Sequence, residues 1–86
     1  MSSKVNNKLL IVLYVPTVEK EYSVFVPVGK TIGAIKTYMC DIVSELSEQN
    51  LINKMYLYDK DGRNKYEDNQ LLKNTNIKNG TRLILM

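Results

Sequence analysis

The sequence predicts an α+β domain in which one long helix packs on one face of a mixed sheet of four to five strands. Near both ends of the chain, short runs of apolar residues are either continuous or alternate with polar residues, which is typical of strands. Only in the middle do apolar residues recur every three or four positions, which is typical of a helix. A lone amphipathic helix among strands has to cover one face of their sheet. The chain has 86 residues and a mass of 9.9 kDa, which suits one domain. We expect residues 1–7 to be a flexible segment and residues 8–86 to form the domain.

The first two strands are predicted to form a β-hairpin. Residues 9–15 are a continuous run rich in Leu, Ile and Val, and Pro16 ends that run because proline cannot donate to a sheet. After a short loop, residues 21–26 form a second run, whose side chains would alternate between the two faces of a strand. Two such runs joined by a short loop are typical of a hairpin.

A helix is predicted to follow the hairpin. Thr31 can cap its first turn, and Asn50 suits its end. Spacings of three and four place one apolar stripe on it, with Lys36 among the polar residues outside that stripe. The stripe comprises Ile32, Ile35, Met39, Ile42, Val43 and Leu46.

The second half of the chain is predicted to hold short elements and a closing strand. These are a strand at residues 54–58, a turn at 59–62, a short strand at 65–67, a helical turn at 69–74, a tight turn at 77–80 and a strand at 81–86. Because side chains alternate along a strand, every second residue of each predicted strand lies on the same face of the sheet, and one of these faces is assigned to the core beneath the helix. That face comprises Leu9, Ile11, Leu13, Tyr22, Val24, Val26, Met55, Leu57, Leu83 and Leu85.

Composition excludes the common catalytic designs. The chain has no histidine and one cysteine, so Ser-His-Asp and Cys-His catalysis, His-containing zinc sites and an internal disulfide are all excluded. Twelve basic and nine acidic residues leave a net charge of +3, but the lysines are scattered, which disfavours nucleic-acid binding. No segment reaches the ~20 apolar residues that span a bilayer. We therefore predict a cytoplasmic, non-enzymatic binding module with no cofactor, no metal and no membrane insertion.

Three isolated features are better explained by structure than by chemistry. Cys40 is expected to be a small residue at the edge of the core, because free cysteine usually behaves as a small hydrophobe. Asp59-Lys60-Asp61-Gly62 begins like a calcium loop, but its later positions lack the required glycine and glutamate, so a turn is expected. Gly29-Lys30-Thr31 resembles the end of a phosphate-binding loop, but Val24 replaces its first glycine.

The sheet face opposite the helix carries the candidate binding site. The first and last strands are apolar on both faces, whereas strands that face solvent on one side normally alternate. Exposed apolar area usually marks an interaction site, so we expect this face to bind a protein partner or a second copy of the chain. Cover by loops or by the N-terminal residues is the alternative. The predicted partner-binding residues are Leu10, Val12, Tyr14, Phe25, Tyr56, Tyr58, Ile84 and Met86, flanked by the cations Lys30, Lys36, Lys54 and Arg82.

This order of elements resembles the β-grasp fold of ubiquitin. Val24-Phe25-Val26 followed by Thr31-Ile32 is similar to the second strand and helix start of ubiquitin-like domains. Leu72 and residues 76–85 resemble their closing segment, Leu-x(4)-Ile-x-x-Gly-x-x-Leu-x-Leu. The likeness covers residues 8–86 and implies a ubiquitin-like interaction domain.

Within that fold the chain resembles the bacterial EsaB/YukD family. The similar parts are Tyr-x-Val-Phe-Val-Pro at residues 22–27 and Asn-Gly-Thr-Arg-Leu-Ile-Leu-Met at residues 79–86. The resemblance implies a cytoplasmic accessory or regulatory component of a type VII (ESX-like) secretion system. Its partners would be cytosolic parts of the membrane proteins of that system. An adaptor or subunit of another multiprotein complex is the alternative. A modifier or sulfur carrier is disfavoured because the chain lacks a C-terminal Gly-Gly.

Overall fold

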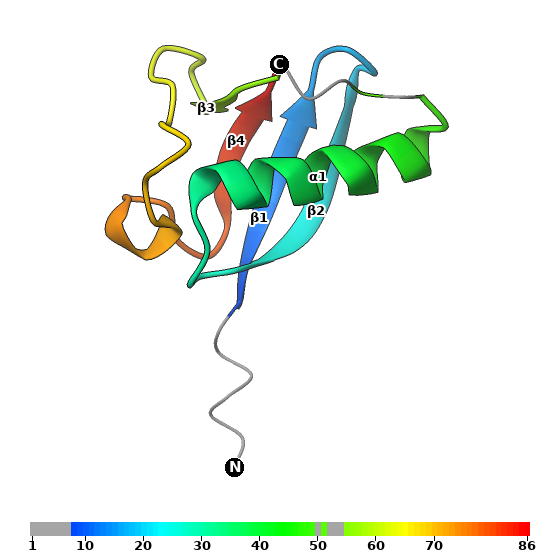
Figure 1. Ribbon diagram of the computed structural model, residues 1–86. Helices are drawn as coiled ribbons and strands as arrows, with labels where there is room; N and C mark the ends of the chain where they lie inside the picture. Colours follow the sequence, from blue (N-terminus) through cyan, green and yellow to red (C-terminus); the bar gives the residue numbers. More distant parts are fainter. Residues whose placement is uncertain (1–7, 50, 52–54) are drawn as a thin grey trace.

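The computed structural model describes residues 8–49, 51 and 55–86, and its elements follow the predicted order (Figure 1). The predicted flexible segment, residues 1–7, and the predicted helix end at Asn50 lie outside the described residues. The elements are β1 (Lys8–Val15), β2 (Lys20–Pro27), α1 (Ile32–Ser47), β3 (Leu57–Asp59), the 3₁₀-helix η2 (Leu72–Asn74) and β4 (Thr81–Leu85).

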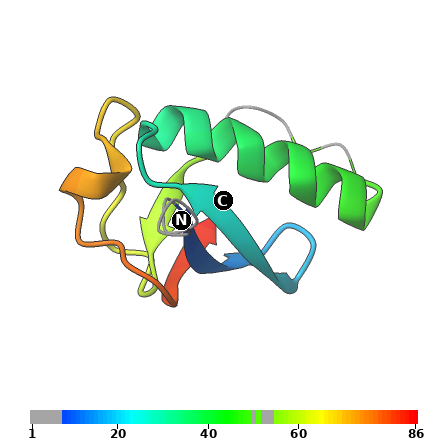
Figure 2. The ribbon, with the colours of Figure 1, turned by 90° about the horizontal axis from the view of Figure 1, so that it is seen from below.

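Four strands form a mixed sheet in the order β2-β1-β4-β3, which confirms the predicted fold class. β1 pairs antiparallel with β2 and parallel with β4, and β3 pairs antiparallel with β4. α1 lies across one face of this sheet, and no helix covers the other face among the described residues (Figures 1 and 2).

The ends of α1 are closed by local hydrogen bonds and backbone geometry. The Thr31 hydroxyl accepts a hydrogen bond from the backbone N–H of Ala34 at 3.2 Å, which confirms the predicted N-cap. The helix ends at Ser47, and Glu48 follows in the left-handed conformation with φ of 60°. A left-handed residue directly after the last turn is a common way for a helix to end.

The core lies between α1 and the covered face of the sheet. All the predicted core residues of the sheet are buried there except Leu9 and Tyr22, which are half-buried against it. From the helix, Ile32, Ile35, Met39 and Val43 are buried, as predicted. The other buried apolar side chains are Val15, Cys40, Leu72 and Ile77.

Two helix residues depart from the predicted stripe. Leu46 is 64% exposed because α1 extends past the sheet at its last turn, so the prediction that it belongs to the core was wrong. Lys36, predicted on the polar side, is 8% exposed. Its aliphatic stem is long enough to lie along apolar surface while the ammonium group reaches a polar partner.

The short elements of the second half are reduced relative to the prediction. Residues 65–67 form no strand; Lys65 makes a single bridge with Tyr58. The helical turn predicted at residues 69–74 is confirmed in part as η2. The strand predicted at residues 54–58 begins at Leu57, and Lys54 lies outside the described residues.

Candidate protein-interaction surface

Strand register brings the predicted binding residues onto the open side of the sheet. Residues opposite each other on paired strands point to the same side. Leu10 is opposite Phe25, and Tyr14 is opposite Ile84, which is opposite Tyr58. Tyr56 and Met86 continue this pairing with two backbone hydrogen bonds of 2.7 and 3.0 Å. We call the surface formed by Leu10, Val12, Tyr14, Phe25, Tyr56, Tyr58, Ile84 and Met86 the sheet face.

Half of the sheet face is exposed and half is partly covered. Phe25 is 59% exposed, and Tyr14, Tyr56 and Met86 are 38%, 43% and 44% exposed. The remaining four side chains are half-buried. Large aromatic and methionine side chains on a protein surface are typical of the anchors of protein interfaces.

An ion pair divides the sheet face into two apolar parts. The Arg82 guanidinium on β4 donates to the Glu21 carboxylate on β2 at 2.6 Å. Because Arg82 is opposite Val12 and Glu21 is opposite Tyr14, the pair crosses β1 between those two side chains. Parity places Glu21 on this face, but only the register shows that it meets Arg82. Arg82, predicted as a cation that flanks the sheet face, is thus paired with Glu21.

The turn after β3 covers one end of the sheet face. A Cβ atom on Gly62 would lie 3.8 Å from the side chains of both Ile84 and Met86, so this turn rests against them. The Asp59 carboxylate holds the turn by accepting hydrogen bonds from Arg63 N–H and from the backbone and side chain of Asn64. The Asn64 side chain is the main reason that the pKa of Asp59 is lowered. Asp59 thus acts within a turn, as the sequence predicts.

Tyr56 differs from the other residues of the sheet face. The Nζ atoms of Lys36 and Lys65 lie 4.9 and 4.5 Å from the centre of its ring. Two ammonium groups at these distances are attracted to the ring electrons. Because Lys36 comes from α1, on the other side of the sheet, the ring lies at the β3 edge rather than in the middle of the face.

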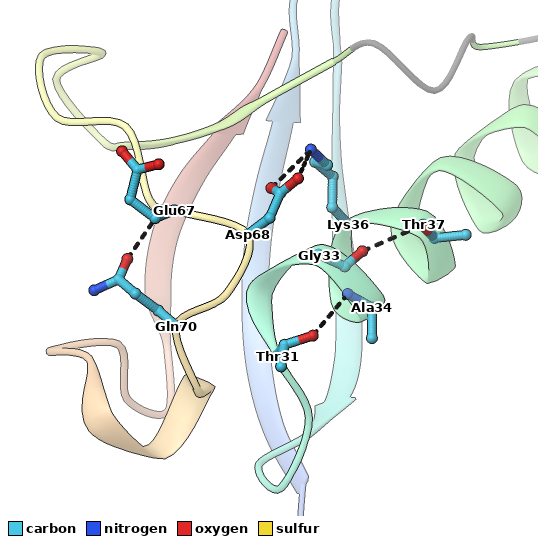
Figure 3. A network of polar contacts seen from close by, with 8 residues as sticks. All are labelled: Thr31, Gly33, Ala34, Lys36, Thr37, Glu67, Asp68 and Gln70. Carbon is cyan, nitrogen blue, oxygen red and sulfur yellow. Dashed lines mark hydrogen bonds and ion pairs between the residues drawn. The ribbon is translucent and has the colours of Figure 1, made fainter.

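Lys36 joins the start of α1 to the loop before η2, as Figure 3 shows. Its ammonium group contacts both carboxylate oxygens of Asp68, at 2.9 and 3.2 Å. In the same loop the backbone carbonyls of Asp68 and Gln70 accept hydrogen bonds from the N–H groups of Gly33 and Ile32. Lys36, predicted as a cation that flanks the binding face, is thus paired with Asp68 within the folded chain.

The lone cysteine is predicted to be unreactive in the folded protein. Cys40 is 2% exposed, and burial raises the pKa of its thiol; Lys36 opposes this rise and Asp41 adds to it. Only the thiolate attacks a disulfide reagent, and a raised pKa leaves less thiolate at neutral pH. We expect an aromatic disulfide reagent to modify Cys40 at pH 7.5 at least about tenfold more slowly in buffer than in denaturant. Equal rates would contradict this burial.

In residues 8–49, 51 and 55–86, no helix combines the length and the hydropathy that crossing a bilayer requires. The same residues contain no group of three or more acidic or cysteine side chains arranged to hold a metal ion.

The chain matches no protein-family model, and no curated protein matches it in sequence. Its likeness to known proteins comes from solved structures. The ubiquitin-like domain of an Arabidopsis thaliana protein aligns with a TM-score of 0.72 and 21% identity over 99% of this chain and 82% of that one.

Two further solved structures are similar to this chain at lower sequence identity. The ubiquitin-like domain of the Mycobacterium tuberculosis type VII secretion system protein EccD1 gives a TM-score of 0.72 at 12% identity, over 92% of this chain and 97% of that one. A chain of an ESX-5 inner membrane complex gives 0.70 at 15% identity, over 93% of this chain and 21% of that one. Identities this low establish the fold alone. The protein described here has the ubiquitin-like β-grasp fold.

Proposed function

We propose that this protein is a non-enzymatic interaction module that binds a protein partner through the sheet face. The observation that carries the proposal is the set of large exposed side chains of the sheet face: Tyr14, Phe25 and Met86, with Tyr56 at its β3 edge. Exposing them to water is unfavourable in the free protein, and covering them with a partner removes that cost.

The geometry of the sheet face favours a partner of mixed chemistry. The Glu21–Arg82 ion pair lies between apolar groups, so an occupant that covers the whole face has to match charge as well as apolar surface. A hollow of about 200 Å³ lies at this point, lined by Val12, Tyr14, Glu21, Lys60, Arg82, Leu83 and Ile84. A side chain of the partner can enter it.

We further propose that the partner belongs to a type VII secretion system, with this chain as a cytoplasmic accessory component. The proposal is supported by the resemblance to the EsaB/YukD family at residues 22–27 and 79–86. It is also supported by the fold shared with a ubiquitin-like domain of EccD1 and with a chain of an ESX-5 inner membrane complex. The cytosolic parts of secretion-system membrane proteins are the partners that we propose.

The test is affinity purification of the tagged chain from the cell that encodes it, followed by mass spectrometry. We expect the wild type to recover membrane components of the secretion system. The double substitution Tyr14→Ser/Met86→Ser should lower that recovery about tenfold, because each side chain is an exposed apolar anchor. Circular dichroism checks that the double variant keeps its fold.

Leu46→Ser is the control, because Leu46 is the exposed apolar side chain in the last turn of α1, away from the sheet face. Its recovery of the same components should equal that of the wild type. Equal recovery by the double variant would refute the sheet face as the site, and reproducible absence of secretion components from the wild type would refute the secretion role. A dimer in sedimentation that the double variant abolishes would instead assign the face to a second copy of the chain.

A further inference from the structure

The fold gathers at one end of the sheet four lysines that are scattered along the sequence. This end holds the start of β1, the connection from β2 to α1 and the segment from η2 to β4, which lie in the lower half of the domain in Figure 1. All four lysines are exposed. We call the surface formed by Lys8, Lys30, Lys73 and Lys78 the basic end.

Contacts between the three segments hold the basic end together. Lys8 and Lys30 line the same hollow. The Leu72 N–H donates to the Lys30 carbonyl at 2.9 Å, which places η2 beside the start of α1. The Gly80 N–H donates at 2.7 Å to the carbonyl of Leu10, two residues after Lys8. The folded chain therefore fixes the backbones that carry these lysines relative to one another.

The segments that form the basic end contain no acidic residue. Residues 8–18, 22–40 and 69–86 include neither Asp nor Glu. The ion pairs within residues 8–49, 51 and 55–86 use Lys36 and Arg82, and none of the four lysines of the basic end takes part in one. The charge of the basic end is therefore not used inside the described part of the fold.

The neighbouring acidic groups do not offset this charge. Asp68 is paired with Lys36, and in Figure 3 the carboxylate of Glu67 points away from the start of α1. A hollow between the turn after β3 and the start of β4 has two acidic and two basic lining residues, namely Asp59, Asp61, Lys60 and Arg82. The basic end thus presents net positive charge to an anionic ligand.

Lysines without arginine favour a broad anionic surface as the ligand. The two arginines of the chain, Arg63 and Arg82, are not among the cations of the basic end. Arginine donates in a rigid fork that matches one phosphate, carboxylate or base edge, whereas lysine acts as a point charge. Because the four lysines come from three separate segments, a flat surface of many anionic groups is able to meet all of them at once.

Two exposed aromatic rings lie beside the lysines. Phe25 and Tyr38 line a hollow of about 320 Å³ together with Lys8 and Lys30, and their exposed fractions are 59% and 45%. Aromatic side chains next to lysines are typical of protein surfaces that rest on the headgroup region of a bilayer. A phospholipid surface offers both anionic groups for the lysines and an apolar boundary for the rings.

We propose that the basic end rests on the anionic phospholipid headgroups of a membrane. The ammonium groups of its lysines attract the headgroup phosphates, and Phe25 and Tyr38 contact the boundary between headgroups and acyl chains. The choice of a membrane over another anionic partner rests on the proposed function, because the partners proposed there are membrane proteins. The lipid contact holds the chain beside them and leaves most of the sheet face open, because the basic end lies where the strands begin or end.

The test is sedimentation of the purified full chain with vesicles made of equal parts phosphatidylglycerol and phosphatidylcholine. Each lysine near such an anionic surface strengthens binding about fivefold. We therefore expect at least about tenfold tighter binding to these vesicles than to vesicles of phosphatidylcholine alone. Raising the ionic strength from about 0.05 M to about 0.5 M should remove the difference, because salt screens the charges. Equal binding to the two kinds of vesicle at low salt would overturn the proposal.

The double substitution Lys30→Glu/Lys73→Glu tests the basic end, with Lys20→Glu/Lys65→Glu as its matched control. Lys20 begins β2 at the other end of the sheet, and the Lys65 ammonium lies over the ring of Tyr56, beside the end of β4. Each Lys→Glu change alters the charge by −2, so both doubles go from +3 to −1. We expect at least about tenfold weaker binding to the anionic vesicles for the first double and less than about threefold for the control. Equal losses would overturn the proposal, because net charge alone would then explain both.

A second variant and two other anionic ligands complete the test. Lys8→Gln/Lys78→Gln adds no negative charge to the basic end and should weaken binding to the anionic vesicles at least about fivefold. Thermal unfolding checks that each variant keeps its fold. A polyglutamate peptide and a single-stranded oligonucleotide, supplied at the same charge concentration as the lipid, should bind the wild type more weakly than the anionic vesicles do. Tighter binding of either one would overturn the membrane as the ligand.

The outcomes for the basic end and for the proposed function are distinguishable, because the vesicles contain no protein. The Tyr14→Ser/Met86→Ser variant should bind the anionic vesicles as the wild type does, since neither side chain belongs to the basic end. A wild type that recovers secretion components but does not bind anionic vesicles overturns the basic-end proposal alone. A wild type that binds the vesicles but recovers no secretion component refutes the secretion role and leaves the lipid contact in place.

Discussion

Met39→Ala is expected to lower the free energy of unfolding by about 3 kcal/mol. Met39 is 1% exposed in the middle of α1 and packs in the core between the helix and the sheet. Truncation removes three heavy atoms from that core and leaves a cavity that rigid strands cannot fill completely. Urea denaturation followed by circular dichroism measures the change.

Leu46→Ala in the same helix is the matched control. Both residues lie on the apolar stripe that the sequence predicts, but Leu46 is 64% exposed. Alanine favours helix at least as well as leucine, so we expect a change within about 0.5 kcal/mol. A loss of similar size in the two variants would contradict the observed end of the core.

Gly33→Val is expected to lower the free energy of unfolding by about 2 to 3 kcal/mol. A Cβ atom at position 33 would lie 3.2 Å from the Cβ atom of Asp68 and 3.3 Å from its carbonyl oxygen. The two methyl groups of valine would push this loop away from α1. The hydrogen bonds to the Asp68 and Gln70 carbonyls and the Lys36–Asp68 ion pair would then be lost together.

Gly29→Val controls for the loss of a glycine. Nothing lies within 4 Å of a Cβ atom at position 29, so we expect a change within about 0.5 kcal/mol. Thermal unfolding of the two variants measures the difference. A Gly33→Val protein as stable as the Gly29→Val protein would show that the loop does not depend on the close approach at Gly33.

The fold was predictable because each element carries a local signal. Continuous and alternating apolar runs predicted β1, β2 and β4, and the change to helical spacing after Thr31 predicted α1. β3 and the residues 65–67 were less well predicted because short segments bury few side chains and leave a weak pattern. Their structure depends on Leu57 and Tyr58, whose backbones pair with β4 on one side and with residues 65–66 on the other.

The candidate surface was predictable in part. Strand parity placed Leu10, Tyr14, Phe25 and Ile84 on the side of the sheet away from the core, and the register agrees. Parity cannot show that a turn rests on Ile84 and Met86, because that contact joins residues 22 to 24 positions apart through a loop. Strand parity also cannot distinguish an unpaired lysine from one, such as Lys36, that forms an ion pair within the folded chain.

The sequence by itself determined the class of this protein: an α+β chain with one helix, no histidine, one cysteine and a sheet with apolar residues on both faces. These properties follow from residue chemistry and from periodicity along the chain, which are local. The tertiary structure decided which charges are free. Lys36 and Arg82 meet Asp68 and Glu21, which lie 32 and 61 positions away, because helix docking and strand order bring them together. The same strand order makes β2 an open edge beside α1, and no local pattern in the chain specifies which strand ends the sheet.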